Sequence, residues 1–502
     1  MAMFDDLFLR PAEPGDSGLL FDWQHAPGVR RYFRHPEPPK RAEHVAWFDS
    51  TLMRWDRLLL IACTREGQAV GMVRLDLADR GAVEVSVLVA PEHQGLGWGV
   101  KALLCARHLA PAAMMVAEVH EENKASARLF EKAGYRQSGE SEGPFRAFIS
   151  PPSLKQQPIS LLIDLGANKG TGHVTRAATL AGALQSLGAP VLLFLPEAPE
   201  GPALPLIEGL DHRVFPLSVP GATVLLVGSR TVVVDHYGLD AKALSQRLKL
   251  PLYVFDDFNR WGGTVGVSPI NGAPALDSEG PGLLGAEYQM LRRDLPAVRP
   301  AARNQQPVRK LLVSLGSTEV PGLTQPLCDL LSAWAAPKKI EVLFVRGSFA
   351  PYPDARPAIR VIEPQPSLSD LIERADIGLL AAGQTLIECL ACGLPTIGLM
   401  VADNQLENLV ALVAADLCLD GGDARPPIED AKGGWQSALI HALDRLVEDA
   451  ALRQGLSGRG PARYDRLGAE RLARRILSRL EDVPLSGTQC MTTGGETRGG
   501  ET

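Results

Sequence analysis

A histidine placed directly after a glycine-rich turn is the first feature of this sequence that could carry chemistry. Gly170-Thr171-Gly172-His173 follows an apolar stretch at 159–164 that we expect to be a strand, and a helical pattern begins at about Val174. Parallel sheets bind ligands at the carboxyl ends of their strands, so the imidazole is expected to line a cleft. An unperturbed pKa of about 6.5 suits a general base. We therefore predict that His173 is catalytic, with helix capping as the alternative.

Polar side chains follow three further strands of the same region. Asp235, His236 and Tyr237 come directly after an apolar strand at 231–234. Asp257 follows a strand at 252–255, and Asn271 follows a shorter one. These groups are expected to point into the cleft that holds His173, although Asp235 and His236 could instead form only a hydrogen-bonding pair at the strand end.

The pattern of strands and helices starts again at 310–315. Ser314-Leu315-Gly316-Ser317-Thr318 ends the first of these strands, and Gly383-Gln384-Thr385 ends the strand at 377–380. A helix carrying Glu388 begins there, and its N-terminal N–H groups suit a diphosphate. Glu388 could accept hydrogen bonds from ribose hydroxyls. Asn404 and Gln405, after the strand at 396–400, are expected to reach the same site.

A second glycine-rich turn lies nearer the start of the chain. Gln94-Gly95-Leu96-Gly97-Trp98-Gly99 follows a strand at 85–89 and precedes a helix at 100–110. Glycines let a ligand approach the backbone closely, and the free N–H groups of the helix suit a pyrophosphate. A plain strand-to-helix turn is the alternative. Glu84 stands on the strand before this turn, where it either serves as a base or faces solvent.

The elements that position these groups require several folding units. A chain of 502 residues, 45% hydrophobic and 22% charged, is expected to form about three globular domains. We predict an α/β fold: a mixed sheet with helices at 1–145, a linker at 146–158, and two doubly wound, Rossmann-like halves at 159–303 and 304–482. The repetitive polar tail, 483–502, is expected to be disordered. The apolar runs at 223–227 and 232–234 are interpreted as buried strands.

Charge and cysteine usage exclude several classes of protein. The formal net charge of −7 argues against a general nucleic-acid binder. No apolar run approaches the roughly 20 residues that span a bilayer, and the acidic N-terminus is not a secretion signal, so we expect no membrane partner and a cytoplasmic location. Cys389 and Cys392 form a C-x-x-C without a second pair, which favours buried small hydrophobes over a metal or redox site.

The glycine-rich turn at 94–99 belongs to a longer pattern that resembles a known family. Gln-x-x-Gly-x-Gly at 94–99, together with Asn-Lys-Ala-Ser-Ala-Arg-Leu-Phe-Glu-Lys-Ala-Gly-Tyr at 123–135, resembles the GNAT N-acetyltransferases over residues 7–140. The resemblance implies acetyl-CoA as co-substrate and Glu84 as the base. In this family a Tyr often acts as the general acid that protonates the leaving thiolate, and this chain has Phe130 at that position. The general acid is therefore unassigned. The implied acetyl-CoA contacts are Val87, Val89, Gln94, Gly95, Gly97, Gly99, Asn123 and Ser126.

The segment before that turn indicates which class of amine is the acceptor substrate. Asp22-Trp23-Gln24 and His44-x-x-Trp47-Phe48 resemble the acceptor side of GNAT enzymes that acetylate amino groups on nucleotide-linked sugars. The resemblance implies that Trp23, His44 and Trp47 face the acceptor. Burial of both tryptophans in the core is the alternative.

The remaining motifs resemble a second family over residues 159–480. Gly-Thr-Gly-His-Val-x-Arg (170–176), Asp-His-Tyr-Gly (235–238), Asp-Asp-x-Asn-Arg (256–260), Leu-Leu-Gly-Ala-Glu-Tyr (283–288) and Ala-Asp-Asn-Gln (402–405) resemble the GT-B superfamily. Within it they resemble the hydrolases that release UDP from UDP-2,4-diacetamido-2,4,6-trideoxy-β-L-altropyranose in pseudaminic acid biosynthesis. The turn at 314–318 lacks the second glycine usual in that family.

That second resemblance implies an inverting hydrolysis without a metal, in which His173 activates water. The implied UDP-sugar contacts are Gly172, Arg176, Asp235, His236, Tyr237, Asp257, Asn271, Tyr288, Gly316, Ser317, Gly383, Gln384, Thr385, Glu388, Asn404 and Gln405. Together the two resemblances imply a multifunctional enzyme of the flagellin-glycosylation type: it acetylates the 4-amino group of a UDP-amino sugar and then hydrolyses the product.

Three alternatives remain open from the sequence. The second part could be a GT-B glycosyltransferase, the sugar could have another stereochemistry, or the GNAT-like part could bind its ligands without turnover. The oligomeric state is open as well.

Overall fold

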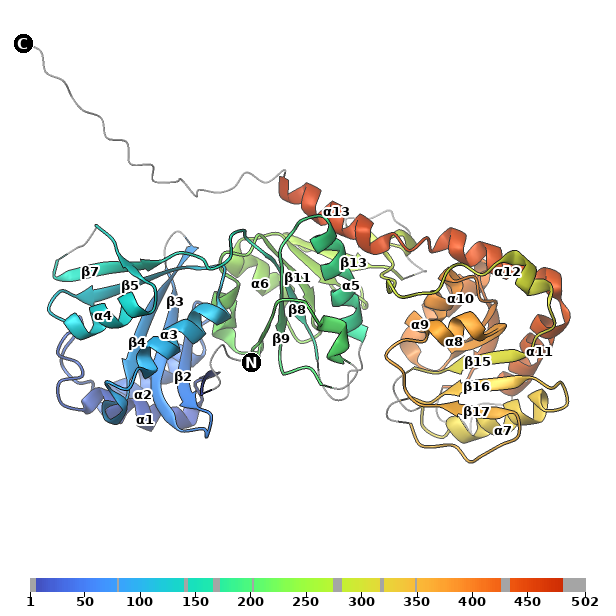
Figure 1. Cartoon of the computed structure of the whole chain (residues 1–502), viewed down its shortest axis with the longest axis horizontal. Helices are drawn as coiled ribbons and strands as arrows, with labels where there is room; N and C mark the ends of the chain where they lie inside the picture. Colours follow the sequence, from blue (N-terminus) through green and yellow to red (C-terminus); the bar gives the residue numbers. More distant parts are fainter. Residues whose placement is uncertain are drawn as a thin grey trace, which may run out of the picture.

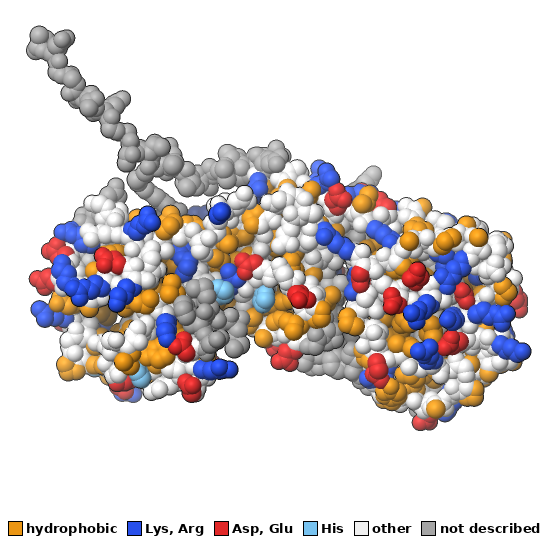
Figure 2. Space-filling view, in the orientation of Figure 1, with side chains coloured by type: hydrophobic (Ala, Val, Ile, Leu, Met, Phe, Trp, Pro, Cys, Tyr) orange, Lys and Arg blue, Asp and Glu red, His pale blue; other side chains and the backbone are white. Residues whose placement is uncertain are grey.

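The computed structural model describes residues 6–78, 81–139, 143–165, 172–200, 203–273, 282–316, 320–347, 350–425 and 434–481. Three α/β bodies follow one another along the chain (Figure 1). Over the face seen in Figure 2, basic and acidic side chains are interspersed across all three bodies. The predicted Ser317 contact and the predicted disordered tail lie outside the described residues.

The first body is a mixed seven-stranded sheet in the order β1-β2-β3-β4-β5-β7-β6. Neighbouring strands are antiparallel, except for the parallel pair of β4 and β5. Val83 and Val85 are buried, while Glu84 and Ser86 between them are partly exposed, so the alternation of β4 gives the sheet two different faces. The strands are β1 (Leu7–Pro11), β2 (Arg57–Thr64), β3 (Ala69–Leu77), β4 (Ala82–Val89), β5 (Met114–His120), β6 (Arg136–Gln137) and β7 (Phe145–Ser150).

Helices cover both faces of this sheet. Helices α1 (Ser17–His25) and α2 (Arg41–Leu52) pack through Leu20, Trp23 and Phe48 on the face that carries Met72 and Leu88. Helices α3 (Trp98–Leu109) and α4 (Lys124–Lys132) cover the opposite face. Because Glu84 and Leu88 are four residues apart on β4, Glu84 lies on the face of α1 and α2.

The boundary of the first body lies later than the sequence indicates. Residues 146–150, assigned above to the linker, belong to β7, which pairs with β5 from Met115↔Ser150 to His120↔Phe145. The linker prediction relied on the Pro, Ser, Gly and Gln content around this strand, whereas the pairing is a contact between segments distant in sequence. The connection to the next body is therefore residues 151–158.

The second body is a parallel sheet in the order β10-β9-β8-β11-β12-β13-β14. Helix α5 (Gly172–Ser186) covers one face, and α6 (Ala241–Leu248) lies on the other. The last helix, α13 (Gly468–Glu481), returns from the end of the chain to pack beside α5 (Figure 1). The strands are β8 (Ile159–Ile163), β9 (Val191–Leu195), β10 (His212–Val214), β11 (Thr231–Asp235), β12 (Leu252–Phe255), β13 (Val267–Asn271) and β14 (Leu283–Leu284).

One of the two apolar runs interpreted as strands is a helix. Residues 232–234 lie in β11 as expected, but 223–227 overlap the 3-10 helix η6 (Pro220–Leu226). A short apolar run has no period that separates a strand from a buried helical turn. Pro220 stands in the first turn of this helix, where its missing N–H costs nothing.

The third body is a parallel sheet in the order β17-β16-β15-β18-β19-β20. Helices α7 (Thr324–Ala335) and α11 (Gly434–Glu448) cover one face, and α8 (Ser369–Arg374), α9 (Gln384–Ala391) and α10 (Leu406–Ala414) cover the other. Helix α12 (Ala450–Arg463) then leads to α13. The strands are β15 (Lys310–Ser314), β16 (Glu341–Val345), β17 (Ile359–Ile362), β18 (Ile377–Ala381), β19 (Thr396–Met400) and β20 (Leu419–Asp423).

The fold class predicted from the sequence is confirmed by this architecture. A mixed sheet is followed by two doubly wound parallel sheets. Strand order reverses between β8 and β11 in the second body and between β15 and β18 in the third. Such reversal points are where open parallel sheets bind ligands. Cys389 and Cys392 are buried on and after α9, as small core side chains.

Candidate functional site

Strands β4 and β5 of the first body part after three paired positions. The pairing runs from Ala82↔Met114 to Glu84↔Val116, although β4 continues to Val89 and β5 to His120. Val87 and Val89 therefore lie on the part of β4 that no longer pairs with β5, and Glu84 stands where the two strands separate. This fork leaves backbone groups available to an extended ligand.

The glycine-rich turn beyond β4 places a helix N-terminus at the fork. Gly95 and Gly97 have φ of +78° and +86°, and Gly97 is the N-cap of α3. Gly99 has a different role, because a Cβ there would lie 2.5 Å from Leu129 Cδ1. Gln94 donates its side-chain amide to the carbonyl of Val89. The turn thus holds open N–H groups at the start of α3, an arrangement suited to a pyrophosphate.

The predicted contacts on α4 form its N-terminal cap. The Asn123 side chain accepts a hydrogen bond from the Ser126 N–H over 3.0 Å. Phe130, where an acidic Tyr was expected from the family, is buried against Tyr135 and Phe148. The Tyr135 hydroxyl donates to Met115 Sδ, and burial raises the pKa of this Tyr to about 12. Tyr135 is therefore a buried core residue.

The three residues predicted to face the acceptor are packed to different extents. Trp23 and His44 are buried, and Trp47 is partly buried beside them. His44 Nε2 donates to the Ser17 carbonyl over 2.9 Å, while burial lowers the pKa of the ring. These contacts give Trp23 and His44 a packing role, and contact with the acceptor stays a prediction.

The segment between α1 and α2, residues 26–40, crosses the same face as Glu84. Arg34 forms an ion pair with Glu118 of β5. The ring of Tyr32 lies 5.4 Å from that of His120, also on β5. The segment therefore spans the sheet beside the fork.

This segment is strongly basic, which the sequence analysis did not single out. Together with Arg41, the first residue of α2, it forms the basic segment 26–41, which carries five Lys or Arg side chains and one carboxylate, Glu37. Arg31 and Arg41 stack on the rings of Tyr32 and Phe21, and neither has an ion-pair partner among the described residues. The signal that could have revealed it is Arg-Arg-Tyr-Phe-Arg at 30–34.

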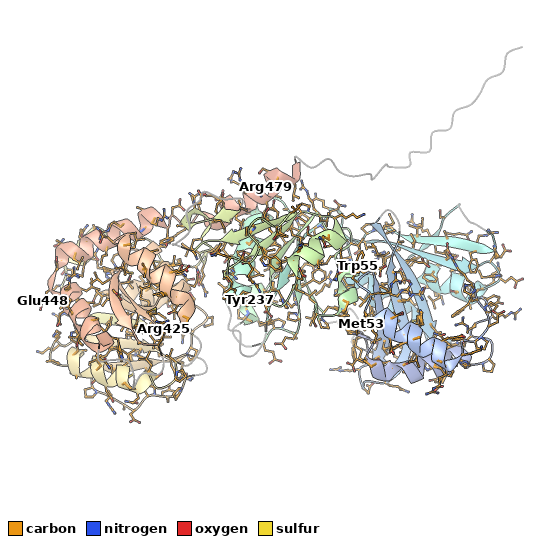
Figure 3. All side chains as sticks on the ribbon, turned by 180° about the vertical axis from the view of Figure 1, so that it is seen from behind. Met53, Trp55, Tyr237, Arg425, Glu448 and Arg479 are labelled. Atoms are coloured by element: carbon orange, nitrogen blue, oxygen red, sulfur yellow. The ribbon has the colours of Figure 1, made fainter. Side chains whose placement is uncertain are left out.

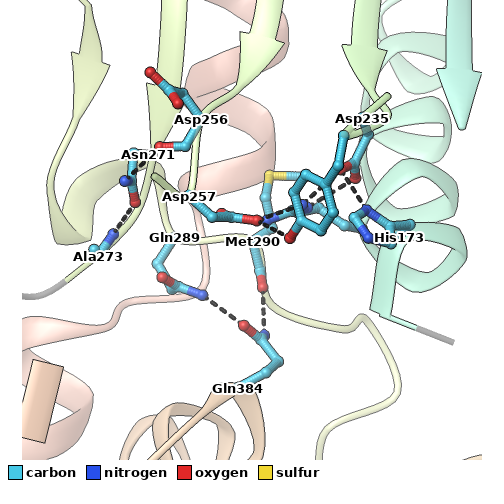
Figure 4. A network of polar contacts seen from close by, with 11 residues as sticks. His173, Asp235, Asp256, Asp257, Asn271, Ala273, Gln289, Met290 and Gln384 are labelled. Carbon is cyan, nitrogen blue, oxygen red and sulfur yellow. Dashed lines mark hydrogen bonds and ion pairs between the residues drawn. The ribbon is translucent and has the colours of Figure 1, made fainter. Parts of the chain in front are cut away.

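A second constellation lies at the strand reversal of the second body (Figure 4). His173 Nδ1 donates to Asp235 over 2.6 Å, and both side chains are buried. Burial alone would raise the pKa of Asp235, but Arg176 and His173 outweigh it and lower the pKa. An ionised Asp235 fixes the proton on Nδ1, so Nε2 of neutral His173 is an acceptor.

Arg176 joins two carboxylates rather than pointing outward. Its guanidinium binds Asp235 over 2.6 and 2.8 Å and Asp257 over 2.8 and 3.0 Å. The Tyr237 hydroxyl donates to Asp257 over 2.7 Å, and the Tyr237 ring lies 4.7 Å from the His173 ring. The structure therefore brings together His173, Arg176, Asp235, Tyr237 and Asp257, as expected, but in one network that orients His173.

An aromatic group beside this network was missed by the sequence analysis. Phe258 is about half exposed and lies edge-on to Tyr237, 5.2 Å between ring centroids. The Arg260 guanidinium lies over both rings and over Trp261. The signal was Asp-Asp-Phe-Asn-Arg-Trp at 256–261, whose two aromatic residues were not taken as site residues.

Three other predicted residues have partners within the second body. His236 Nδ1 accepts from the Gly238 N–H, and Nε2 lies 3.6 Å from Asp164. Asn271 is buried, donates to the Asp256 carbonyl and accepts from the Ala273 N–H. Tyr288 packs partly buried against the core under α5 and α13. Gly172 begins α5 directly before His173.

The third body contributes a helix N-terminus at its own strand reversal. Gly383 is the N-cap of α9, and Thr385 lies partly exposed in the first turn. Gln384 donates to the Met290 carbonyl over 2.7 Å and accepts from Gln289 over 2.8 Å (Figure 4). These contacts join α9 to the segment that leaves the second body.

Glu388, one turn into α9, has an altered acidity. Burial raises its pKa to about 7, against a weaker opposing hydrogen bond from Gln384. Of the other predicted contacts, Gly316 has φ of +99° after β15. Asn404 lies in the 3-10 helix η9 (Asp403–Gln405), and Gln405 accepts from the Val401 N–H.

Neither a metal-binding cluster nor a membrane-spanning helix is found in the part of the chain that the structure describes. Those residues hold no cluster of three or more His, Cys, Asp or Glu side chains arranged to bind a metal. Among them, too, no helix combines the length and apolar character needed to cross a bilayer.

The first body matches a known domain family. Residues 6–136 match the model of the acetyltransferase (GNAT) domain. The N-terminal module is a GNAT acetyltransferase domain. This confirms the predicted acetyltransferase part and agrees with acetyl-CoA as its co-substrate. Residues 6–150 are called the GNAT module. The second body is called the first half, and the third body is called the second half.

A curated relative extends beyond the GNAT module. The chain is 23% identical over 195 residues to the spore coat polysaccharide biosynthesis protein SpsG of Bacillus subtilis (strain 168). The aligned part is 38% of this chain and 56% of the relative, so the chain spans little more than half of the relative's length. Because 195 residues exceed the 6–136 match, part of this similarity lies outside the GNAT module.

Solved N-acetyltransferase structures match just under a third of this chain. Spermidine N-acetyltransferase from Vibrio cholerae, in complex with CoA and spermine, is 19% identical, with 29% of this chain and 96% of that chain covered and a TM-score of 0.27. The aminoglycoside acetyltransferase AAC(6')-Ib with coenzyme A is also 19% identical, with 29% and 94% covered and a TM-score of 0.27.

Proposed function

We propose that this chain acts twice on one nucleotide-linked amino sugar. The GNAT module transfers the acetyl group of acetyl-CoA to the 4-amino group of UDP-4-amino-4,6-dideoxy-N-acetyl-β-L-altrosamine. The two halves then hydrolyse UDP-2,4-diacetamido-2,4,6-trideoxy-β-L-altropyranose to UDP and free sugar with inversion. The His173–Asp235 pair at the strand reversal of the first half carries the hydrolase proposal, and the GNAT family match carries the transferase proposal.

An anionic acceptor is favoured by the local charge of segment 26–41 in the GNAT module. The basic segment 26–41 crosses the face on which Glu84 lies, and Arg31 and Arg41 have no carboxylate partner among the described residues. This positive potential attracts a diphosphate and repels a polyamine. The similarity to the spore coat polysaccharide biosynthesis protein SpsG, part of which lies outside the GNAT module, also supports sugar chemistry there.

The acetyl transfer needs one proton acceptor. The neutral 4-amine attacks the thioester carbonyl, the C–S bond breaks, and the coenzyme leaves as thiol or thiolate. The proton lost by the amine passes to Glu84, directly or through water. The position of Glu84 at the fork of β4 and β5 supports this role.

The hydrolysis needs a base and two binding surfaces for UDP. Water attacks the anomeric carbon, Nε2 of His173 takes its proton, and the glycosyl C–O bond to UDP breaks. Asp235 stabilises the imidazolium that forms. The N-terminus of α9 suits the diphosphate and Glu388 the ribose hydroxyls.

A product assay by mass spectrometry tests both activities. The purified chain is incubated with acetyl-CoA and the UDP-linked 4-amino sugar, and each is omitted in turn. Free diacetamido sugar and UDP, formed only with acetyl-CoA, are expected. Acetylated UDP-sugar that is never cleaved would overturn the hydrolase and favour a glycosyltransferase or another sugar; binding of acetyl-CoA without turnover would overturn the transferase.

Glu84→Gln is expected to slow acetyl transfer by about 10²-fold, with the larger loss at low pH, where the amine is mostly protonated. The pH profile of kcat/KM measures this. Asp49→Asn, on an exposed turn of α2, is the matched control and should leave the profile unchanged. A wild-type profile in Glu84→Gln would remove Glu84 as the base.

UDP affinity is expected to rise about tenfold between pH 6 and pH 8. The Glu388 carboxyl, with its pKa raised to about 7, becomes a carboxylate over this range and then accepts from the ribose hydroxyls. Isothermal titration with UDP measures the effect. Glu388→Gln should lose it, while the titration of the nucleotide's own phosphate is common to both proteins. If UDP affinity depends on pH equally in the wild type and in Glu388→Gln, Glu388 does not contact the ribose hydroxyls.

A further inference from the structure

The first half lacks the helix layer that the second half has. In the second half, α8, α9 and α10 cover one face of the sheet and α7 and α11 the other. In the first half, α5 and α13 cover one face, while among the described residues of the same body only α6 and the 3-10 helix η6 cover the opposite face. A parallel sheet must be covered on both faces.

The GNAT module completes that missing layer. The side chains that β8, β9, β11 and β12 direct toward this face form one buried core with η6 and with residues of the GNAT sheet and α3. Leu162, Phe194, Val232 and Val254 are among the members from the first half. A core that runs continuously through two bodies differs from the more polar contact usual between domains.

Two glycines set the closeness of the contact. A Cβ on Gly221, in η6, would lie 2.1 Å from the Arg57 carbonyl oxygen on β2. A Cβ on Gly228, which has φ of +85°, would lie 2.2 Å from the carbonyl oxygen of Ala112. Any side chain at either position would force the backbones of the two bodies apart.

A buried polar side chain also forms a hydrogen bond across this boundary. Arg213 of β10 is 6% exposed, and its guanidinium donates to the His108 carbonyl on α3. At the rim, the Arg247 guanidinium of α6 lies 5.9 Å from the ring centroid of Trp55, which Figure 3 places where the GNAT module meets the first half. The Arg213 guanidinium also donates to Asp211 and to the His212 carbonyl of its own body, so this one buried side chain bonds both structures together.

We infer that the GNAT module and the first half form a single cooperative folding unit, in which the acetyltransferase sheet serves as the missing outer layer of the first Rossmann-like sheet. The second half is a separate unit with both faces of its sheet covered by its own helices. The first half then requires the GNAT module for its own fold, because that module covers one apolar face of its sheet. The inference holds whatever the two modules catalyse.

Hydrogen exchange of the full-length chain, followed by mass spectrometry in low concentrations of guanidinium chloride, tests this. Amides of β2 and β3 in the GNAT module and of β8 and β11 in the first half are expected to exchange through one opening, with the same free energy and denaturant dependence. Amides of β15 and β18 are expected to follow another. Openings that differ between the GNAT module and the first half would overturn the inference.

Gly221→Ala adds a second test, with Gly18→Ala as its matched control. The Gly221 variant is expected to lower protection at least tenfold in both bodies and to leave β15 and β18 unchanged, since a tenfold change is about 1.4 kcal/mol. Gly18 lies in α1 with nothing within 4 Å of its added Cβ, so its variant should keep wild-type protection. Loss of protection confined to one body would overturn the inference; if Gly221→Ala does not fold, the wild-type exchange decides.

Discussion

Replacing His173 with alanine is expected to reduce UDP release by about a thousandfold while acetyl transfer continues at the wild-type rate. Only Nε2 of this ring is available as a proton acceptor, because Nδ1 donates to Asp235 over 2.6 Å. The GNAT module has its own base candidate, Glu84, at the fork of β4 and β5. The measurement is the rate of UDP formation from UDP-diacetamido sugar, beside the rate of CoA formation from acetyl-CoA.

His212→Ala is the matched control for this prediction. His212 lies on β10 of the same half, and its Nδ1 contacts the Leu210 carbonyl rather than the Asp235 network. Its variant should release UDP at the wild-type rate. Wild-type UDP release by the His173 variant would show that another group activates the water, and loss of both activities would point to a folding defect.

Replacing Arg176 with methionine is expected to lower the free energy of unfolding by about 3–5 kcal/mol. The guanidinium is the cation that holds Asp235 and Asp257, and Asp235 is 2% exposed. Without it, a buried carboxylate keeps only His173 as a partner or must take up a proton. Guanidinium chloride denaturation measures the loss, and UDP release should fall with it because His173 loses its fixed orientation.

Arg474→Met provides the comparison for Arg176. Arg474 pairs with Glu470 on the surface of α13, where the two side chains are 65% and 44% exposed. Such a pair contributes about 0.5 kcal/mol or less, so this variant should unfold close to the wild type. A second comparison is Arg176→Met combined with Asp235→Asn, which should recover part of the loss. Equal stability of Arg176→Met and Arg474→Met would contradict the role given to the buried network.

The elements of this protein were largely readable from local patterns. The strand expected at 252–255 is β12, and the helix expected from about Val174 begins two residues earlier, at Gly172. Glycines that must adopt positive φ, such as Gly95 and Gly97, were found because few other residues tolerate that conformation. In these cases the information lies within a few consecutive residues.

The partners of the candidate site residues were less readable. Arg176 joins Asp235 and Asp257, which lie 59 and 81 residues further along the chain, and its expected contact with the ligand stays a prediction. Asn271 was expected at the ligand and holds the Asp256 carbonyl. A polar residue after a strand has the same local pattern whether it faces a ligand or braces a neighbouring loop, so the pattern cannot separate the two.

The sequence by itself determined the order of the modules, the types of their strands and helices, and the turns that carry His173, Gly97 and Gly383. These features follow from periodicity and from the conformational range of single residues. The tertiary structure decided that η6 is helical, that α13 returns to the first half, and that the GNAT sheet closes the core of its neighbour. Those outcomes depend on which apolar faces meet, and a face carries no mark of its partner until the chain has folded.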